Sequence, residues 1–108
     1  MKSTITIDVE TDENQVPQRI VWTAEDGGVA EREARAMLLA MWDDTDGIAM
    51  RMDLWTKKMT VEEMQHFTCQ TLMTLADTFE RATSDAGHAR ALREFTGELA
   101  RRLGVREG

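Results

Sequence analysis

The segment from Thr60 to about residue 82 predicts a long amphipathic helix, and no other part of the sequence restricts the fold as strongly. Thr60 and Glu63 fit a capping box, in which the Thr60 hydroxyl accepts from the Glu63 amide and the Glu63 carboxylate accepts from the Thr60 amide. Apolar residues then recur at helical spacing on one side: Val61, Met64, Leu72, Leu75 and Phe79. At about 1.5 Å per residue the helix spans roughly 33 Å, so it is long enough to cross a small sheet completely.

Three segments have the character of strands: the first and the third alternate apolar and polar residues, which is typical of one buried face, and the second is rich in β-branched and aromatic residues. The first covers about residues 4–10. The second covers about residues 18–24 and follows the turn-forming segment TDENQVP, so the two predict a hairpin. One face of this hairpin would carry Ile5, Ile7, Val9, Ile20 and Trp22. The third segment, Ile48–Trp55, is the clearest strand, with its even-numbered residues apolar.

Two further helices are predicted. The first covers about residues 30–42, where four residues fall at helical spacing: Ala34, Met37, Leu38 and Met41. The last follows the segment TSDAG, carries a narrow apolar stripe and ends at Gly104. Its other face is rich in arginine, and it either docks on the acidic remainder of the chain or faces a partner.

The resulting order, ββαβαα, predicts an α+β fold: a three-stranded, mainly antiparallel sheet with three helices on one face. If the strand at 48–55 pairs with the strand at 4–10, all neighbours are antiparallel, but the sequence leaves the strand order open. A chain of 108 residues and 12.3 kDa is the size of one domain, so we expect a single domain over 1–108. Its 42% of apolar residues supply enough side chains for one core.

Composition narrows the class of protein. Twenty acidic and 13 basic residues give a net charge of −7, which repels nucleic acid and makes general nucleic-acid binding an unexpected function. The single cysteine cannot form an internal disulfide, and the first residues do not resemble a signal peptide. No run approaches the ~20 apolar residues of a spanning helix. We therefore expect a cytoplasmic protein that is not inserted in a membrane.

The sequence predicts no catalytic, cofactor or metal site. His66 and Cys69 are three residues apart on the predicted helix, but no third catalytic group lies near them, so Cys69 is interpreted as a small core residue. The two histidines and one cysteine match no metal-ligand spacing. The acidic segment Asp43–Gly47 resembles the start of a calcium loop, yet it is also the ordinary chemistry of a turn.

The outer face of the predicted sheet is the candidate binding surface. If the even-numbered residues of 48–55 face the helices, the odd-numbered ones face away, together with residues of the second strand. Tryptophan beside arginine is typical of protein interfaces. The candidate protein-binding residues are therefore Arg19, Arg51, Asp53 and Trp55. In the alternative interpretation, Trp55 curls round the strand end onto the core.

Three segments in this order resemble the gliding motility-associated protein GldC family: WTAEDGG, DLWTKKM and LADTFERAT. The similarity runs over about residues 3–106. It implies a small soluble accessory protein of the gliding machinery, with no catalytic motif whose residues can be carried over to this chain.

Two functions follow as hypotheses. The first is an accessory protein that acts through contacts with a protein partner of the gliding or envelope machinery, without catalysis. The alternative is a small-molecule or ion-binding module, or a weak enzyme, with a pocket between sheet and helices. Homo-oligomerisation, through strand edges or the outer sheet face, is compatible with both.

Overall fold

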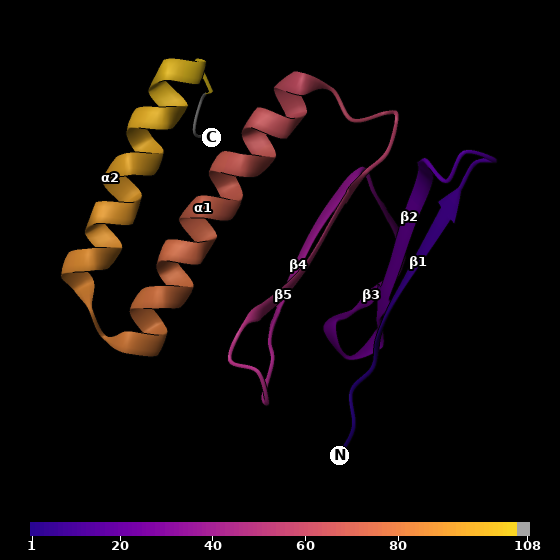
Figure 1. The fold of residues 1–108 in the computed structure, drawn as a ribbon, viewed down its shortest axis with the longest axis horizontal. Coiled ribbons are helices and arrows are strands. Elements are labelled where there is room, and N and C mark those ends of the chain that lie inside the picture. The colour runs from indigo at the N-terminus through magenta and orange to yellow at the C-terminus, as the bar shows by residue number, and fades with distance from the viewer. Residues whose placement is uncertain (106–108) are drawn as a thin grey trace. The chain divides into compact units, whose positions relative to one another are not determined.

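The computed structural model describes residues 1–105 and divides the chain into two compact units (Figure 1). The first, Met1–Met59, holds the strands and is termed the sheet unit; the second begins at Thr60, holds the helices and is termed the helix unit. The elements are β1 (Ile5–Thr11), β2 (Pro17–Ala24), the 3-10 turn η1 (Glu25–Gly27), β3 (Val29–Ala34), β4 (Ala36–Trp42), β5 (Ala49–Trp55), α1 (Val61–Thr83) and α2 (Ala86–Leu103). The expectation of one domain over 1–108 stays a prediction.

Strands β1, β2 and β3 form an antiparallel sheet in that order. The predicted hairpin is confirmed, because Ile7 lies opposite Trp22 and Val9 lies opposite Ile20. Residues directly opposite each other share a face, so this sheet has one apolar face and one polar face. Ile20 is 1% exposed and is the largest apolar side chain that is fully buried among residues 1–105.

Residues 30–42 do not form a helix, so that prediction was wrong. They form β3 and β4, and β4 pairs with β5 in a second, antiparallel sheet from Ala36 opposite Trp55 to Trp42 opposite Ala49. Apolar residues fill every position of 36–42, so the segment satisfies the period of a helix and of a strand equally. The backbone partner offered by β5 then decides in favour of a strand, because tertiary context overrides intrinsic propensity.

The predicted fold is therefore only partly confirmed. The chain is α+β and contains a three-stranded sheet, but residues 1–105 form two α-helices instead of three and an additional two-stranded sheet. The strand predicted at 48–55 is present as β5. Its neighbour is β4 and not β1. The strand order that placed it next to the first strand therefore does not occur.

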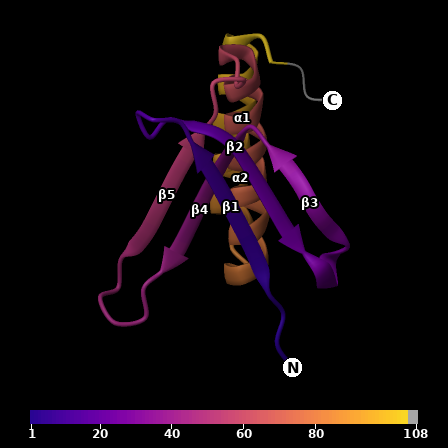
Figure 2. The same ribbon diagram turned by 90° about the vertical axis from the view of Figure 1, so that its right-hand side faces the viewer.

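The segment Thr56–Lys58, which follows β5, ties the two sheets together within the sheet unit. The Thr56 amide donates to the Arg35 carbonyl at the bend between β3 and β4, at 2.8 Å. Lys57 Nζ donates to the Asp12 carboxylate in the β1–β2 turn at 2.7 Å, and Lys58 binds a carboxylate on β3. These contacts hold the sheets at the junction from which they diverge in Figure 2.

Asp12 organises the β1–β2 turn as well as binding Lys57. Its carboxylate accepts from the backbone amides of Asn14 and Val16, at 2.8 Å and 3.0 Å. The Lys57 ammonium, followed by the Val16 amide, lowers the pKa of Asp12 below its ordinary value. A turn residue near the N-terminus is in this way linked to the segment after the last strand.

The helix unit is an α-helical hairpin with the predicted start. Thr60 and Glu63 form the full capping box, with both bonds at 3.0 Å. The second helix begins at Ala86, because the Asp85 side chain accepts from the His88 amide and caps it, and it ends at Gly104 with φ of 73°. The sequence placed the start of this helix after the segment TSDAG, and the structure begins it inside that segment, at Ala86.

Small side chains form the buried part of the helix unit: Cys69, Ala76, Ala89, Thr96 and Ala100. Small residues let helices approach closely, since the distance between axes depends on the side chains at the contact. Arg93 on α2 adds hydrogen bonds to Asp77 and Glu80 on α1, at 2.8 Å and 2.7 Å, and these bonds raise the pKa of its guanidinium. Larger apolar side chains of the helices remain accessible, among them Phe95 at 61%.

Candidate functional site

The β4–β5 hairpin presents an apolar surface on each of its two faces. The register places six residues together on one side, here termed the methionine face: Met37, Leu39, Met41, Met50, Met52 and Leu54. The other side carries eight residues and is termed the tryptophan face: Ala36, Leu38, Ala40, Trp42, Ala49, Arg51, Asp53 and Trp55. A strand that is apolar on both faces is typical of a sheet that is covered on both sides.

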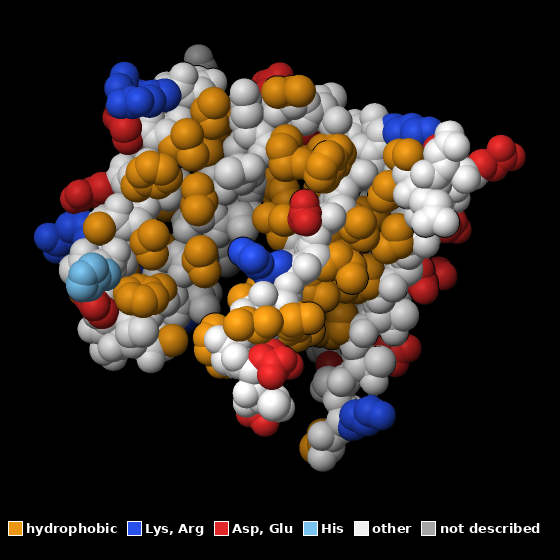
Figure 3. All heavy atoms as spheres, viewed as in Figure 1, with side chains coloured by type: hydrophobic (Ala, Val, Ile, Leu, Met, Phe, Trp, Pro, Cys, Tyr) orange, Lys and Arg blue, Asp and Glu red, His pale blue; other side chains and the backbone are white. Residues whose placement is uncertain are grey.

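The large side chains of the tryptophan face are exposed. Trp42 is 74% exposed, Trp55 is 55% exposed and Leu38 is 54% exposed. Hydrophobic side chains also gather visibly over the strands in the space-filling view (Figure 3). Contiguous apolar surface of this kind marks sites of interaction on soluble proteins, whereas scattered single residues do not.

The structure brings together three of the four predicted binding residues. Arg51, Asp53 and Trp55 alternate along β5 and share the tryptophan face. Within residues 1–105, neither the Arg51 nor the Asp53 side chain forms a hydrogen bond or ion pair with another part of the chain. An exposed tryptophan therefore lies beside one free positive and one free negative charge.

Arg19 lies elsewhere. It belongs to β2 in the three-stranded sheet, and its guanidinium is 3.9 Å from carboxylates of both Glu10 and Glu33. These are long, exposed ion pairs on the polar face of that sheet. The prediction placed Arg19 on one outer face with the β5 residues because it assumed a single sheet, and the second sheet separates them.

Leu38 and Trp42 were missed as members of the site. Both lie in the segment that the sequence assigned to a helix, where they could not share a sheet face with β5. The available signal was at the even-numbered positions of 36–42, where small and large residues alternate. In a strand, these positions lie on one face: Ala36, Leu38, Ala40 and Trp42.

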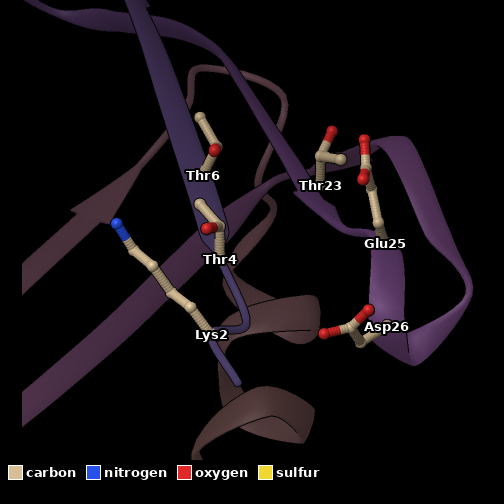
Figure 4. A pocket seen from close by; sticks show the side chains of 6 residues that line it. All are labelled: Lys2, Thr4, Thr6, Thr23, Glu25 and Asp26. Carbon is tan, nitrogen blue, oxygen red and sulfur yellow. The ribbon is translucent and has the colours of Figure 1, made fainter.

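A polar cavity of about 190 Å³ lies beside the start of β1, away from the β4–β5 faces. Figure 4 shows its lining: Lys2, Thr4, Thr6, Thr23, Glu25 and Asp26. The Ser3 hydroxyl donates to the Asp26 carboxylate at its rim. Hydroxyl, ammonium and carboxylate groups line it without a large apolar side chain, which is typical of a hydrated depression. It is not the pocket between sheet and helices of the alternative hypothesis, which stays a prediction.

The other residues singled out for chemistry have structural roles. Cys69 is 3% exposed within the helix unit, as expected of a small core residue. The Asp43 carboxylate accepts from the amides of Thr45 and Asp46, at 3.1 Å and 2.7 Å, and so shapes the β4–β5 turn. Within residues 1–105 there is no group of three or more His, Cys, Asp or Glu side chains placed to hold a metal ion.

Comparison with known protein families identifies the family of this chain. A family model described as gliding motility-associated protein GldC-like covers residues 17–105, which is most of the chain. Searches of curated proteins and of solved structures found no significant match. Neither α1 nor α2 is long and apolar enough to cross a membrane.

Proposed function

Because this chain belongs to the GldC-like family of gliding motility-associated proteins, we propose that it is an accessory protein of the gliding machinery that acts by binding other protein chains. We place its action in the cytoplasm, and we assign it no catalytic step. Its partners in this proposal belong to the gliding or envelope machinery.

The tryptophan face is the observation that carries the proposal. Trp42, Trp55 and Leu38 are each more than half exposed on one face of a two-stranded sheet. Tryptophan and arginine are enriched among residues that contribute most to protein interfaces, because each combines a large contact area with a polar group. The face therefore has the composition of a protein-binding surface.

Binding without turnover accords with the position of the only thiol. Cys69 is buried in the helix unit, where a substrate has no access to its sulfur. The alternative, a ligand-binding module, is tested by a thermal-shift screen of metabolites and metal ions. A bound ligand would raise the melting temperature as its concentration exceeds its dissociation constant.

Site-specific photo-crosslinking in the native host tests the proposed binding surface. A photoreactive phenylalanine analogue at position 38 should give covalent adducts with protein, identified by mass spectrometry. The matched control carries the same analogue at Glu10, an exposed residue on the polar face of the three-stranded sheet. Equal adduct yields at the two positions, or none at position 38, would refute the tryptophan face as a binding surface.

A further inference from the structure

The sheet unit and the helix unit bury very few large apolar side chains. None of the leucine, methionine, phenylalanine or tryptophan residues in 1–105 is buried, although 42% of the sequence is apolar. The buried apolar residues are Ile20, Cys69, Ala76, Ala89 and Ala100. Burial of apolar surface is the dominant favourable contribution to folding, so further apolar surface of this chain needs a cover.

Both faces of the β4–β5 hairpin carry exposed apolar side chains, so each face requires a packing partner. An isolated two-stranded sheet is at best marginally stable in water. The methionine face is uniformly apolar, and Met41, Met50 and Met52 on it are each more than half exposed. The tryptophan face differs because it carries Arg51 and Asp53 among its apolar residues.

We propose that the tryptophan face is covered by the same face of a second copy of this chain, so that the protein is a two-fold symmetric homodimer. This inference rests on the proposed function in one respect, the assignment of the tryptophan face as a protein contact. It adds that the chain bound at this face is a second copy of this protein, so that a partner from the gliding or envelope machinery would bind elsewhere on the dimer. The order of residues on the face is complementary to itself under a two-fold rotation.

The two-fold axis of the proposed dimer passes over the centre of the hairpin, where Leu39 lies opposite Met52. It lies parallel to the sheet and perpendicular to the strands. Rotation about it sets β5 against β5 and β4 against β4, each antiparallel to its counterpart, with the sheets about 10 Å apart as in other stacked sheets. In such an isologous contact each pair of residues occurs twice.

On β5 this symmetry pairs opposite charges and unequal sizes. Arg51 faces the partner's Asp53, and Asp53 faces the partner's Arg51, which supplies both free charges with a counterion. Trp55 faces the partner's Ala49, so a large side chain meets a small one. In each of these pairs the two residues are equally far along β5 from Met52, over which the axis passes.

On β4 the same axis pairs the remaining four residues. Trp42 faces the partner's Ala36, and Leu38 faces the partner's Ala40. Alternation of large and small residues across facing positions lets two layers interdigitate without voids. All eight residues of the tryptophan face thus meet a residue of complementary size or charge.

The available area suits a specific dimer. From the exposed fractions of Trp42, Trp55 and Leu38, these side chains present roughly 400 Å² per copy, taking about 150–250 Å² for an aromatic side chain. Over two copies, and with the five other residues of the face, the total reaches about 1,200 Å², the lower end of specific interfaces.

Charge reversal tests the proposed register with the full chain in solution. Sedimentation equilibrium of the purified protein should give twice the 12.3 kDa mass of the chain. Arg51→Asp sets two acids against each other twice per dimer, and Asp53→Arg sets two bases against each other twice. Each variant alone should dimerise about 100-fold more weakly, since like charges at an interface cost several kcal/mol.

The decisive measurement mixes the two variants. A heterodimer of Arg51→Asp with Asp53→Arg again has opposite charges at every pair, so the mixture should dimerise nearly as tightly as the unaltered protein. Recovery on mixing also shows that both variants are folded. Arg19→Asp, the same charge change on β2, should leave dimerisation unchanged.

Three results would overturn the dimer: a monomer at about 100 µM for the unaltered chain, dimers of undiminished affinity for both variants, or no recovery on mixing. The photo-crosslink at position 38 distinguishes failure of the dimer from failure of the proposed function. An adduct with a different protein and none with a second copy would refute the dimer alone. Absence of any adduct would refute both.

Discussion

The buried hydroxyl of Thr56 leads to a prediction whose sign is opposite to that of most core substitutions. Thr56 is 2% exposed, and its Oγ1 has no hydrogen-bond partner among residues 1–105. A buried polar group without a partner costs about 1–3 kcal/mol. Thr56→Val replaces the hydroxyl with a methyl group of similar size, so it should raise the free energy of unfolding by about 1–2 kcal/mol, or the melting temperature by roughly 4–8 °C.

Thr96→Val is the matched control, because it makes the same chemical change at a site where the hydroxyl is used. Thr96 is 1% exposed, and its Oγ1 donates to the Leu92 carbonyl at 2.8 Å. Loss of that bond should lower the free energy of unfolding by about 1 kcal/mol. Both variants remove a buried threonine hydroxyl, and among residues 1–105 only the Thr96 hydroxyl has a partner.

Urea denaturation followed by circular dichroism measures both variants at one fixed protein concentration, which matters for any chain that associates. A higher midpoint for Thr56→Val and a lower one for Thr96→Val would support the reasoning. If Thr56→Val lowers the midpoint as much as Thr96→Val does, the Thr56 hydroxyl contributes a favourable interaction and the reasoning is wrong.

Three further predictions concern the sheet and helix units separately. Ile20→Ala should lower the free energy of unfolding by about 2–5 kcal/mol in urea denaturation, because Ile20 is 1% exposed; a loss below about 1 kcal/mol would contradict its role as core. Thr60→Ala should lower it by about 0.5–2 kcal/mol, since it removes the α1 cap, and restoration by Thr60→Ser is the control. For Asp12, the folded-state pKa lies below its ordinary value, so the stability it contributes is present above pH 4 and is lost as pH falls through the folded-state pKa. The midpoints of Asp12→Asn and the unaltered protein should therefore differ at pH 7 and converge as the pH falls through the folded-state pKa of Asp12; a constant difference would show that the Lys57 and amide contacts do not depend on charge.

The sequence predicted the residues that β5 contributes to the candidate site but not those of the neighbouring strand. Alternation along 48–55 placed Arg51, Asp53 and Trp55 on one face, because side-chain direction in a strand depends only on position. The neighbours of that face depend on which strand pairs with β5, and that is decided far away in the chain. For this reason Arg19 was included and Leu38 and Trp42 were left out.

Local patterns by themselves determined β1, β2, β5 and α1, together with the capping box of Thr60 and Glu63. Each of these depends on residues within a few positions, whose periodicity or hydrogen bonding admits one regular structure. Residues 29–42 admit two, since their apolar residues fit both periods. Only the pairing of β4 with β5 and of β3 with β2 decided between them, because backbone groups of those distant strands supply the hydrogen bonds that a helix would have made within itself.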